Sequence, residues 1–190
     1  MDISSKLLTK RKAHKQPFKK AMTQPSLKIS HTGNVGFKEI CFPETAHKIR
    51  FQHYCDRSVS QKQQFIFPDT IRDLSLDIDY PLHLIKLPKN LEKLSISTSE
   101  DDITQLELPE SLKILRINTW KDSAFNNSSL SGFKFPSSLV ELEFGYWFNG
   151  ELDNADFPST LKTITINYPS LKKDAKKIKL PTDIKVVFVQ

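Results

Sequence analysis

Residues 108–117 of the chain read LPESLKILRI and contain the pattern that organises the rest of the sequence. Counted from the proline as position zero, apolar residues stand at −1, +3, +6 and +8, and a small polar residue stands at +2. The frame recurs at Pro43, Pro68, Pro88, Pro109, Pro136, Pro158 and Pro181. Their spacings of 20 to 27 residues are typical of the coils of a short solenoid, so we expect a stacked repeat structure.

The residues that follow each proline predict a short strand. Apolar residues alternate at +6 and +8, which is the period of a strand with one buried face. Proline cannot donate to a sheet, so it must lie in the turn before the strand. We expect the +2 side chain, Ser111 in the coil quoted above, to accept a hydrogen bond from a nearby N–H of its own turn.

The rest of each coil must return to its start, so successive strands run parallel and each coil contacts only its neighbours. The predicted fold is therefore a β-rich, mixed α/β solenoid, leucine-rich-repeat-like, with one short parallel strand per coil and irregular return segments. The predicted inward pairs at +6 and +8 are Ile49/Phe51, Leu74/Leu76, Leu94/Ile96, Leu115/Ile117, Leu142/Phe144, Ile164/Ile166 and Val187/Val189.

The motif Leu-x-x-Leu-x-Ile at residues 112–117, with its equivalents across about residues 40–190, resembles the leucine-rich repeat family. It is similar to the FNIP-repeat variety, in which Leu-Pro-x-Ser-Leu-x-x-Leu-x-Leu is followed by Phe-Asn. Phe148-Asn149 follows the fifth repeat at that place, and Phe125-Asn126 follows the fourth after a longer loop. Ile-Pro follows neither pair, which departs from the family pattern. The resemblance implies a protein that recognises other proteins.

Positive charge is concentrated at the N-terminus. Residues 1–38 hold nine Lys or Arg and one acid, whereas residues 39–190 hold nineteen bases and twenty-one acids. We predict that 1–38 is a disordered basic tail and that 39–190 is a seven-coil repeat domain. The basic cluster of the tail is Lys10, Arg11, Lys12, Lys19 and Lys20. It is a candidate nuclear-import signal or phosphate-binding arm, and a plain solvated tail is the alternative.

Other function classes find little support in the sequence. There is no apolar segment behind the N-terminal charges and no run of eighteen apolar residues, so we expect a cytoplasmic or nuclear protein that is neither secreted nor inserted in a membrane. Cys41, His47, His53 and Cys55 fit no familiar zinc spacing, so no metal or cofactor is predicted. No phosphate loop or nucleophile motif occurs, and we predict that the chain is not an enzyme.

Strand positions +5, +7 and +9 are expected to face outward and to form the concave surface. The charged candidates there are Arg50, Asp73, Lys93, Arg116, Glu141 and Glu143. This mixed strip lacks the clustered bases and interleaved aromatics of a nucleic-acid face and suits a protein ligand, with a plain solvated face as the alternative. The aromatic candidates are Trp120, Tyr146 and Trp147, which either anchor an interface or fill the wide coil made by residues 118–133.

We therefore expect a non-catalytic module that binds a protein partner through the concave strand face and loops. The alternative is a nucleic-acid-associated protein that uses the basic tail. The last motif ends in the apolar run 186–189, and an uncapped strand edge there would favour self-association.

Overall fold

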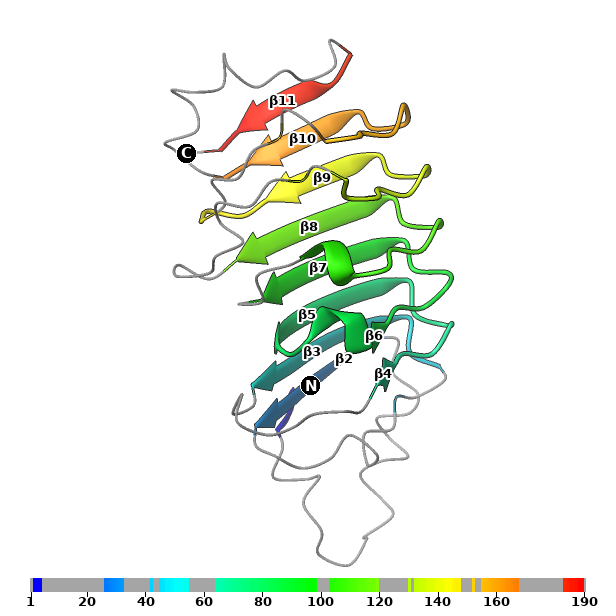
Figure 1. The fold of residues 1–190 in the computed structure, drawn as a ribbon. Helices are drawn as coiled ribbons and strands as arrows, with labels where there is room; N and C mark the ends of the chain where they lie inside the picture. Colours follow the sequence, from blue (N-terminus) through cyan, green and yellow to red (C-terminus); the bar gives the residue numbers. More distant parts are fainter. Residues whose placement is uncertain are drawn as a thin grey trace, which may run out of the picture.

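The computed structural model describes residues 2–4, 26–32, 42, 45–54, 64–98, 103–119, 130, 132–147, 152, 155–167 and 183–189. Within these residues the chain is rich in strands and holds only short 3-10 helices. The strands stack one above another like the rungs of a ladder (Figure 1). The predicted solenoid of parallel strands is therefore confirmed.

In the described residues one sheet contains nine parallel strands, which lie side by side in the order of the sequence. They are β1 (Asp2–Ser4), β2 (Ser26–Thr32), β3 (Lys48–Tyr54), β5 (Asp73–Asp79), β7 (Lys93–Thr98), β8 (Ile114–Thr119), β9 (Glu141–Phe144), β10 (Thr163–Ile166) and β11 (Lys185–Phe188). The return segments add β4 (Phe65–Ile66), β6 (Ile85–Lys86) and the 3-10 helices η3 (Leu82–Leu84) and η4 (Ile103–Gln105). β4 pairs with β6 in a second, parallel sheet of two strands.

Five of the repeated prolines lie in the described ranges, and each of these opens a tight turn. The N–H of Ile71 donates to the carbonyl of Pro68 at 3.1 Å, which closes a four-residue β-turn. The same bond joins Leu91 to Pro88, Leu112 to Pro109, Leu139 to Pro136 and Leu161 to Pro158. The proline contributes an acceptor to this turn and needs no N–H, which explains why it is tolerated before these five strands.

The polar residue at +2 links successive coils, which differs from the sequence prediction. The Ser111 hydroxyl donates to the carbonyls of Leu91 at 2.7 Å and Lys89 at 2.8 Å, both in the preceding coil. Equivalent bonds to the +3 carbonyl of the preceding coil run from Thr70 to Ala46, from Ser138 to Leu112 and from Thr160 to Leu139. The side chain is therefore a donor along the solenoid axis, because the stack leaves a turn carbonyl of each coil in need of a donor.

The inner face of the main sheet carries the apolar column. Six of the seven predicted inward pairs are fully or almost fully buried: Ile49/Phe51, Leu74/Leu76, Leu94/Ile96, Leu115/Ile117, Leu142/Phe144 and Ile164/Ile166. The return segments pack Phe65, Tyr80 and Leu82 into the same core. Burying one such side chain contributes about 1.5–3 kcal/mol, so the column is the main source of stability.

The prediction of the seventh inward pair, Val187/Val189, is wrong by one residue. Val186 lies in register with Ile164 of β10, and Phe188 lies in register with Ile166. Val186 and Phe188 therefore pack against the core, whereas Val189 is 45% exposed. A shift of one residue exchanges the two faces of a strand, and the continuous apolar run left both registers open in the sequence. The structure selects the register that places the large Phe188 ring inside.

The sheet also extends into the segment that we predicted to be a disordered tail. β2 pairs with β3 over seven residues, with Leu27 beside Ile49 and Ile29 beside Phe51, and β1 pairs with β2. The prediction is wrong for these two strands, because β3 offers a backbone edge and Ile29 can join the apolar column. The basic cluster at residues 10–20 lies outside the described residues.

Candidate binding face

The outward residues of β2 to β11 form the surface that we call the outer strand face. Its first row, in register across neighbouring strands, is Ser26, Lys48, Asp73, Lys93, Ile114, Glu141, Thr163 and Lys185. Its second row is Lys28, Arg50, Ser75, Ser95, Arg116, Glu143, Thr165 and Val187. All six charged candidates from the sequence lie in these two rows, and consecutive strands bring them side by side.

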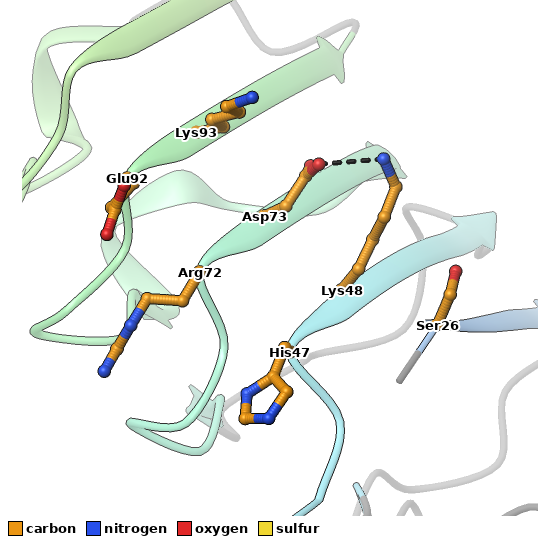
Figure 2. A pocket seen from close by; sticks show the side chains of 7 residues that line it. All are labelled: Ser26, His47, Lys48, Arg72, Asp73, Glu92 and Lys93. Carbon is orange, nitrogen blue, oxygen red and sulfur yellow. Dashed lines mark hydrogen bonds and ion pairs between the residues drawn. The ribbon is translucent and has the colours of Figure 1, made fainter. Parts of the chain in front are cut away.

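Half of these six candidates form ion pairs with residues of an adjacent strand. Lys48 Nζ lies 2.8 Å from Asp73 Oδ2, as Figure 2 shows, and Arg116 Nε lies 2.8 Å from Glu143 Oε2. Asn167 Nδ2 also donates to Glu143 Oε1 at 2.9 Å. Exposed pairs of this kind contribute about 0–1 kcal/mol. Asp73, Arg116 and Glu143 therefore help to hold neighbouring strands in register as well as facing outward.

A hollow of about 270 Å³ lies on the outer strand face over β3, β5, β7 and β8. Four predicted candidates, namely Arg50, Asp73, Lys93 and Arg116, line it together with other residues of the first two rows. Ser75 and Ser95 stand in register between the two arginines, and their small side chains leave the space open. These serines are not among the residues predicted from the sequence, although both occupy the +7 position of adjacent coils.

Charge around this hollow is unbalanced. Over β2 to β8 the first two rows hold five bases and one acid, Asp73. The Arg50 and Lys93 side chains are exposed and form no hydrogen bond or ion pair within the described part of the chain. Guanidinium and ammonium groups next to hydroxyls are donors suited to carboxylate or phosphate oxygens. The hollow can therefore hold an anionic group.

A second hollow, of about 420 Å³, lies where β3, β5 and β7 begin. His47 and Arg72 line it and point away from the Lys48–Asp73 pair (Figure 2). Arg72 Nη1 donates to the carbonyls of Asp69 at 3.0 Å and Asn90 at 3.2 Å, so its guanidinium links two coils. Its donors are therefore partly used by the scaffold, which makes this hollow the weaker binding candidate.

Two of the three aromatic candidates are exposed. Tyr146 and Trp147 lie in the turn after β9 and are 52% and 38% exposed. Their ring centroids lie 4.8 Å apart in an edge-to-face arrangement. They do not fill the interior of the coil, and exposed aromatic side chains of this kind anchor many protein interfaces. Trp120 lies outside the described residues.

Of Cys41, His47, His53 and Cys55, the structure describes the two histidines. His53 is buried among the rings of Phe51, Phe65 and Tyr80. His47 is exposed, with Nδ1 3.0 Å from the carbonyl oxygen of Thr70. No group of three metal-ligating side chains occurs among the described residues, and Cys41 and Cys55 are not part of them.

One stretch of the chain matches the model of a known repeat family. No helix in the described ranges is long and apolar enough to cross a membrane. The search among curated proteins found no match. The family model of the FNIP repeat matches residues 125–169, the stretch that includes β9, β10 and the turn with Tyr146 and Trp147. The predicted resemblance is thereby confirmed for residues 125–169, which match the FNIP repeat.

Proposed function

We propose that the chain is a non-catalytic interaction module that binds a protein partner through its outer strand face. The main observation that supports this is the contrast between the two faces of one sheet. Inner positions are apolar in coil after coil, whereas the outer rows change from basic to acidic to polar along the stack. A repeat protein that varies only its outward residues presents a specific surface on a constant frame.

The exposed aromatic pair supports the same proposal. Tyr146 and Trp147 stand at the end of β9, whose outward residues Glu141 and Glu143 belong to the outer strand face. Aromatic anchors beside patterned charge are the features that dominate binding energy in protein interfaces. Electrostatic complementarity of the charged rows would then set which partner binds.

The test is a comparative affinity purification with the full chain as bait. Ser95→Tyr fills the first hollow, and Lys86→Ala changes a half-buried residue of β6 that lies away from the outer strand face. We expect Ser95→Tyr to lose proteins that both the wild type and Lys86→Ala retain, with all three baits equally folded by circular dichroism. Identical sets of retained proteins from all three baits would contradict the proposal.

Nucleic-acid association through residues 10–20 remains the alternative proposal. Binding of duplex DNA by that segment should weaken by about 0.9 log units per phosphate contact for each tenfold rise in salt. Deletion of residues 1–20 should abolish it while leaving β2 in place. Self-association through β11 is likewise a proposal, and light scattering at high protein concentration measures it directly.

A further inference from the structure

The hollow over β3 to β8 differs from its surroundings in how its bases are neutralised. Elsewhere, bases and acids of neighbouring coils pair directly, as in Lys86–Glu107 at 2.7 Å and Lys113–Glu92 at 3.2 Å. Inside the hollow, Lys48 Nζ forms an ion pair with Asp73 Oδ2 at 2.8 Å. Lys93, on the other side of Asp73, is left without a partner among the described residues.

The second row of the outer strand face adds to the excess of positive charge at the hollow. In register, Arg50 stands between Lys28 of β2 and Ser75 of β5. Like charges opposite each other on adjacent strands are destabilising, so nothing in this arrangement favours Arg50 for stability. The residue is nevertheless exposed and lines the hollow. Such a placement is expected when a base serves a ligand that supplies the missing negative charge.

The spacing of the donors limits the size of that ligand. Arg50 and Arg116 are three strands apart, which is about 14 Å at a strand spacing of about 4.8 Å. Arg50 and Arg116 flank Ser75 and Ser95 across a hollow of about 270 Å³, and Arg116 Nε is bonded to Glu143 on the side away from Ser95. The hydroxyls of the two serines add neutral donors between the two guanidinium groups. The space suits one oxyanion and the short side chain that carries it.

The acids around the hollow argue against a long polyanion. Asp73 lies on its wall, and Glu141 and Glu143 follow on β9, immediately beyond Ile114 and Arg116. A nucleic-acid backbone crossing the sheet would meet these carboxylates, and no aromatic side chain lines the hollow for base stacking. A peptide with one acidic group avoids that repulsion.

We infer that this hollow binds a single carboxylate or phosphate group carried by an extended segment of a protein partner. Arg50 and Lys93 supply the free positive charges, and Arg116 and the two serines complete the donor set. The inference rests on the proposed function and names the chemistry of the partner at that same face. A carboxylate would come from Asp or Glu of the partner, and a phosphate from a phosphorylated hydroxyl residue.

The experiment measures fluorescence anisotropy of labelled probes with the full-length protein at low salt. Three peptides of equal length differ at one central residue, which is serine, glutamate or phosphoserine, and a single-stranded oligonucleotide is the fourth probe. We expect the glutamate or the phosphoserine peptide to bind at least about tenfold more tightly than the serine peptide, and whichever binds more tightly identifies the source of the anion.

The variant Arg50→Gln/Lys93→Gln should abolish that preference, so that charged and neutral peptides bind alike. The control Lys134→Gln/Lys162→Gln removes the same charge from exposed lysines that do not line the hollow and should retain the preference. Urea unfolding of both variants checks that the fold is intact.

Equal binding of all three peptides by the wild type, an equal loss in both double variants, or preference for the oligonucleotide would overturn the inference. If Ser95→Tyr still loses the purified partner in that case, the proposed function stands and only the anionic chemistry is wrong.

Discussion

Leu115 and Arg116 are consecutive residues of β8, yet they belong to two different regions of the molecule. Leu115 is 1% exposed and lies in a column where every neighbouring strand also places a large apolar residue. Arg116 faces outward and lies between Ser95 and Glu143, two residues that are unlike it and unlike each other. Strand alternation thus separates a constant structural face from a variable outer one, and the predictions below test that separation.

The largest expected effect comes from the inner face of β3. Phe51 is fully buried, and the Phe42, Phe65 and Phe67 ring centroids lie within 6.0 Å of its own. Phe51→Ala should lower the free energy of unfolding by about 3–5 kcal/mol, measured by urea denaturation, because it opens a cavity among these rings. The next residue, Gln52, faces outward, and Gln52→Ala should cost less than about 1.5 kcal/mol. Equal losses would remove the distinction between the faces.

Gly145 stands at an outward position of its coil, but it is buried against Asn118 of the preceding coil. A Cβ built there would lie 2.5 Å from Asn118 Oδ1 and 3.1 Å from Asn118 Cα. Its N–H also donates to the carbonyl of Ile117 at 2.8 Å. Gly145→Ala should therefore destabilise the protein by about 1–3 kcal/mol through overpacking, measured as a lower urea midpoint.

The double variant Gly145→Ala/Asn118→Gly is the control for that clash. It removes the Asn118 side chain, so it should be more stable than the sum of the two single changes predicts. Strict additivity would show that the contact is not the cause of the loss.

The hydroxyl bonds between coils should have a smaller effect. Ser111→Ala removes the donor to the Leu91 and Lys89 carbonyls and should cost about 1 kcal/mol of unfolding free energy, measured by thermal and urea denaturation. Ser111→Thr should retain most of the stability, because Thr160 donates to the two equivalent carbonyls, of Ser137 and Leu139, in the coil before it. A Thr variant as unstable as the Ala variant would mean that the hydroxyl is not the stabilising group.

The smallest effect concerns charge pairing away from the outer strand face. The hydrogen bond from Lys86, followed by its positive charge, lowers the pKa of Glu107 below its ordinary value. A depressed carboxylate pKa stabilises the fold at pH values above the unfolded pKa, and this contribution disappears as the pH falls through the folded pKa. Lys86→Ala should raise the pKa of Glu107, as followed by NMR titration of its side chain. An unchanged titration would show that the pair does not form in solution.

The repeat frame made the seven proline-linked strands predictable, because four apolar positions per coil leave few alternative registers. Strand β2 was missed because Ala21, and not proline, stands five residues before Ser26, and because only Leu27 and Ile29 match the apolar positions Ile49 and Phe51 of β3. The register of β11 was wrong because residues 186–189 are apolar on both alternations. Local pattern cannot decide between such registers, since the choice depends on packing against β10.

The sequence predicts which residues belong to the outer strand face, but not how their side chains pair or where the hollow lies. Once the +5 and +7 positions are known, the row neighbours Lys48, Asp73 and Lys93 can be read from the sequence. Which of the two lysines forms the ion pair with Asp73 depends on side-chain geometry. The hollow above Ser75 and Ser95 depends on side-chain geometry as well. The exposure of Tyr146 and Trp147 likewise depends on how the turn after β9 folds.

The most direct test of the separation between the two faces compares Leu115→Ala with Arg116→Ala in one urea-unfolding experiment. Leu115→Ala should lose about 2–5 kcal/mol of unfolding free energy, because its side chain leaves a cavity in the column. Arg116→Ala removes an exposed ion pair with Glu143 and should lose about 1 kcal/mol or less. Equal losses from these adjacent residues would contradict the division of each strand into a structural face and a binding face.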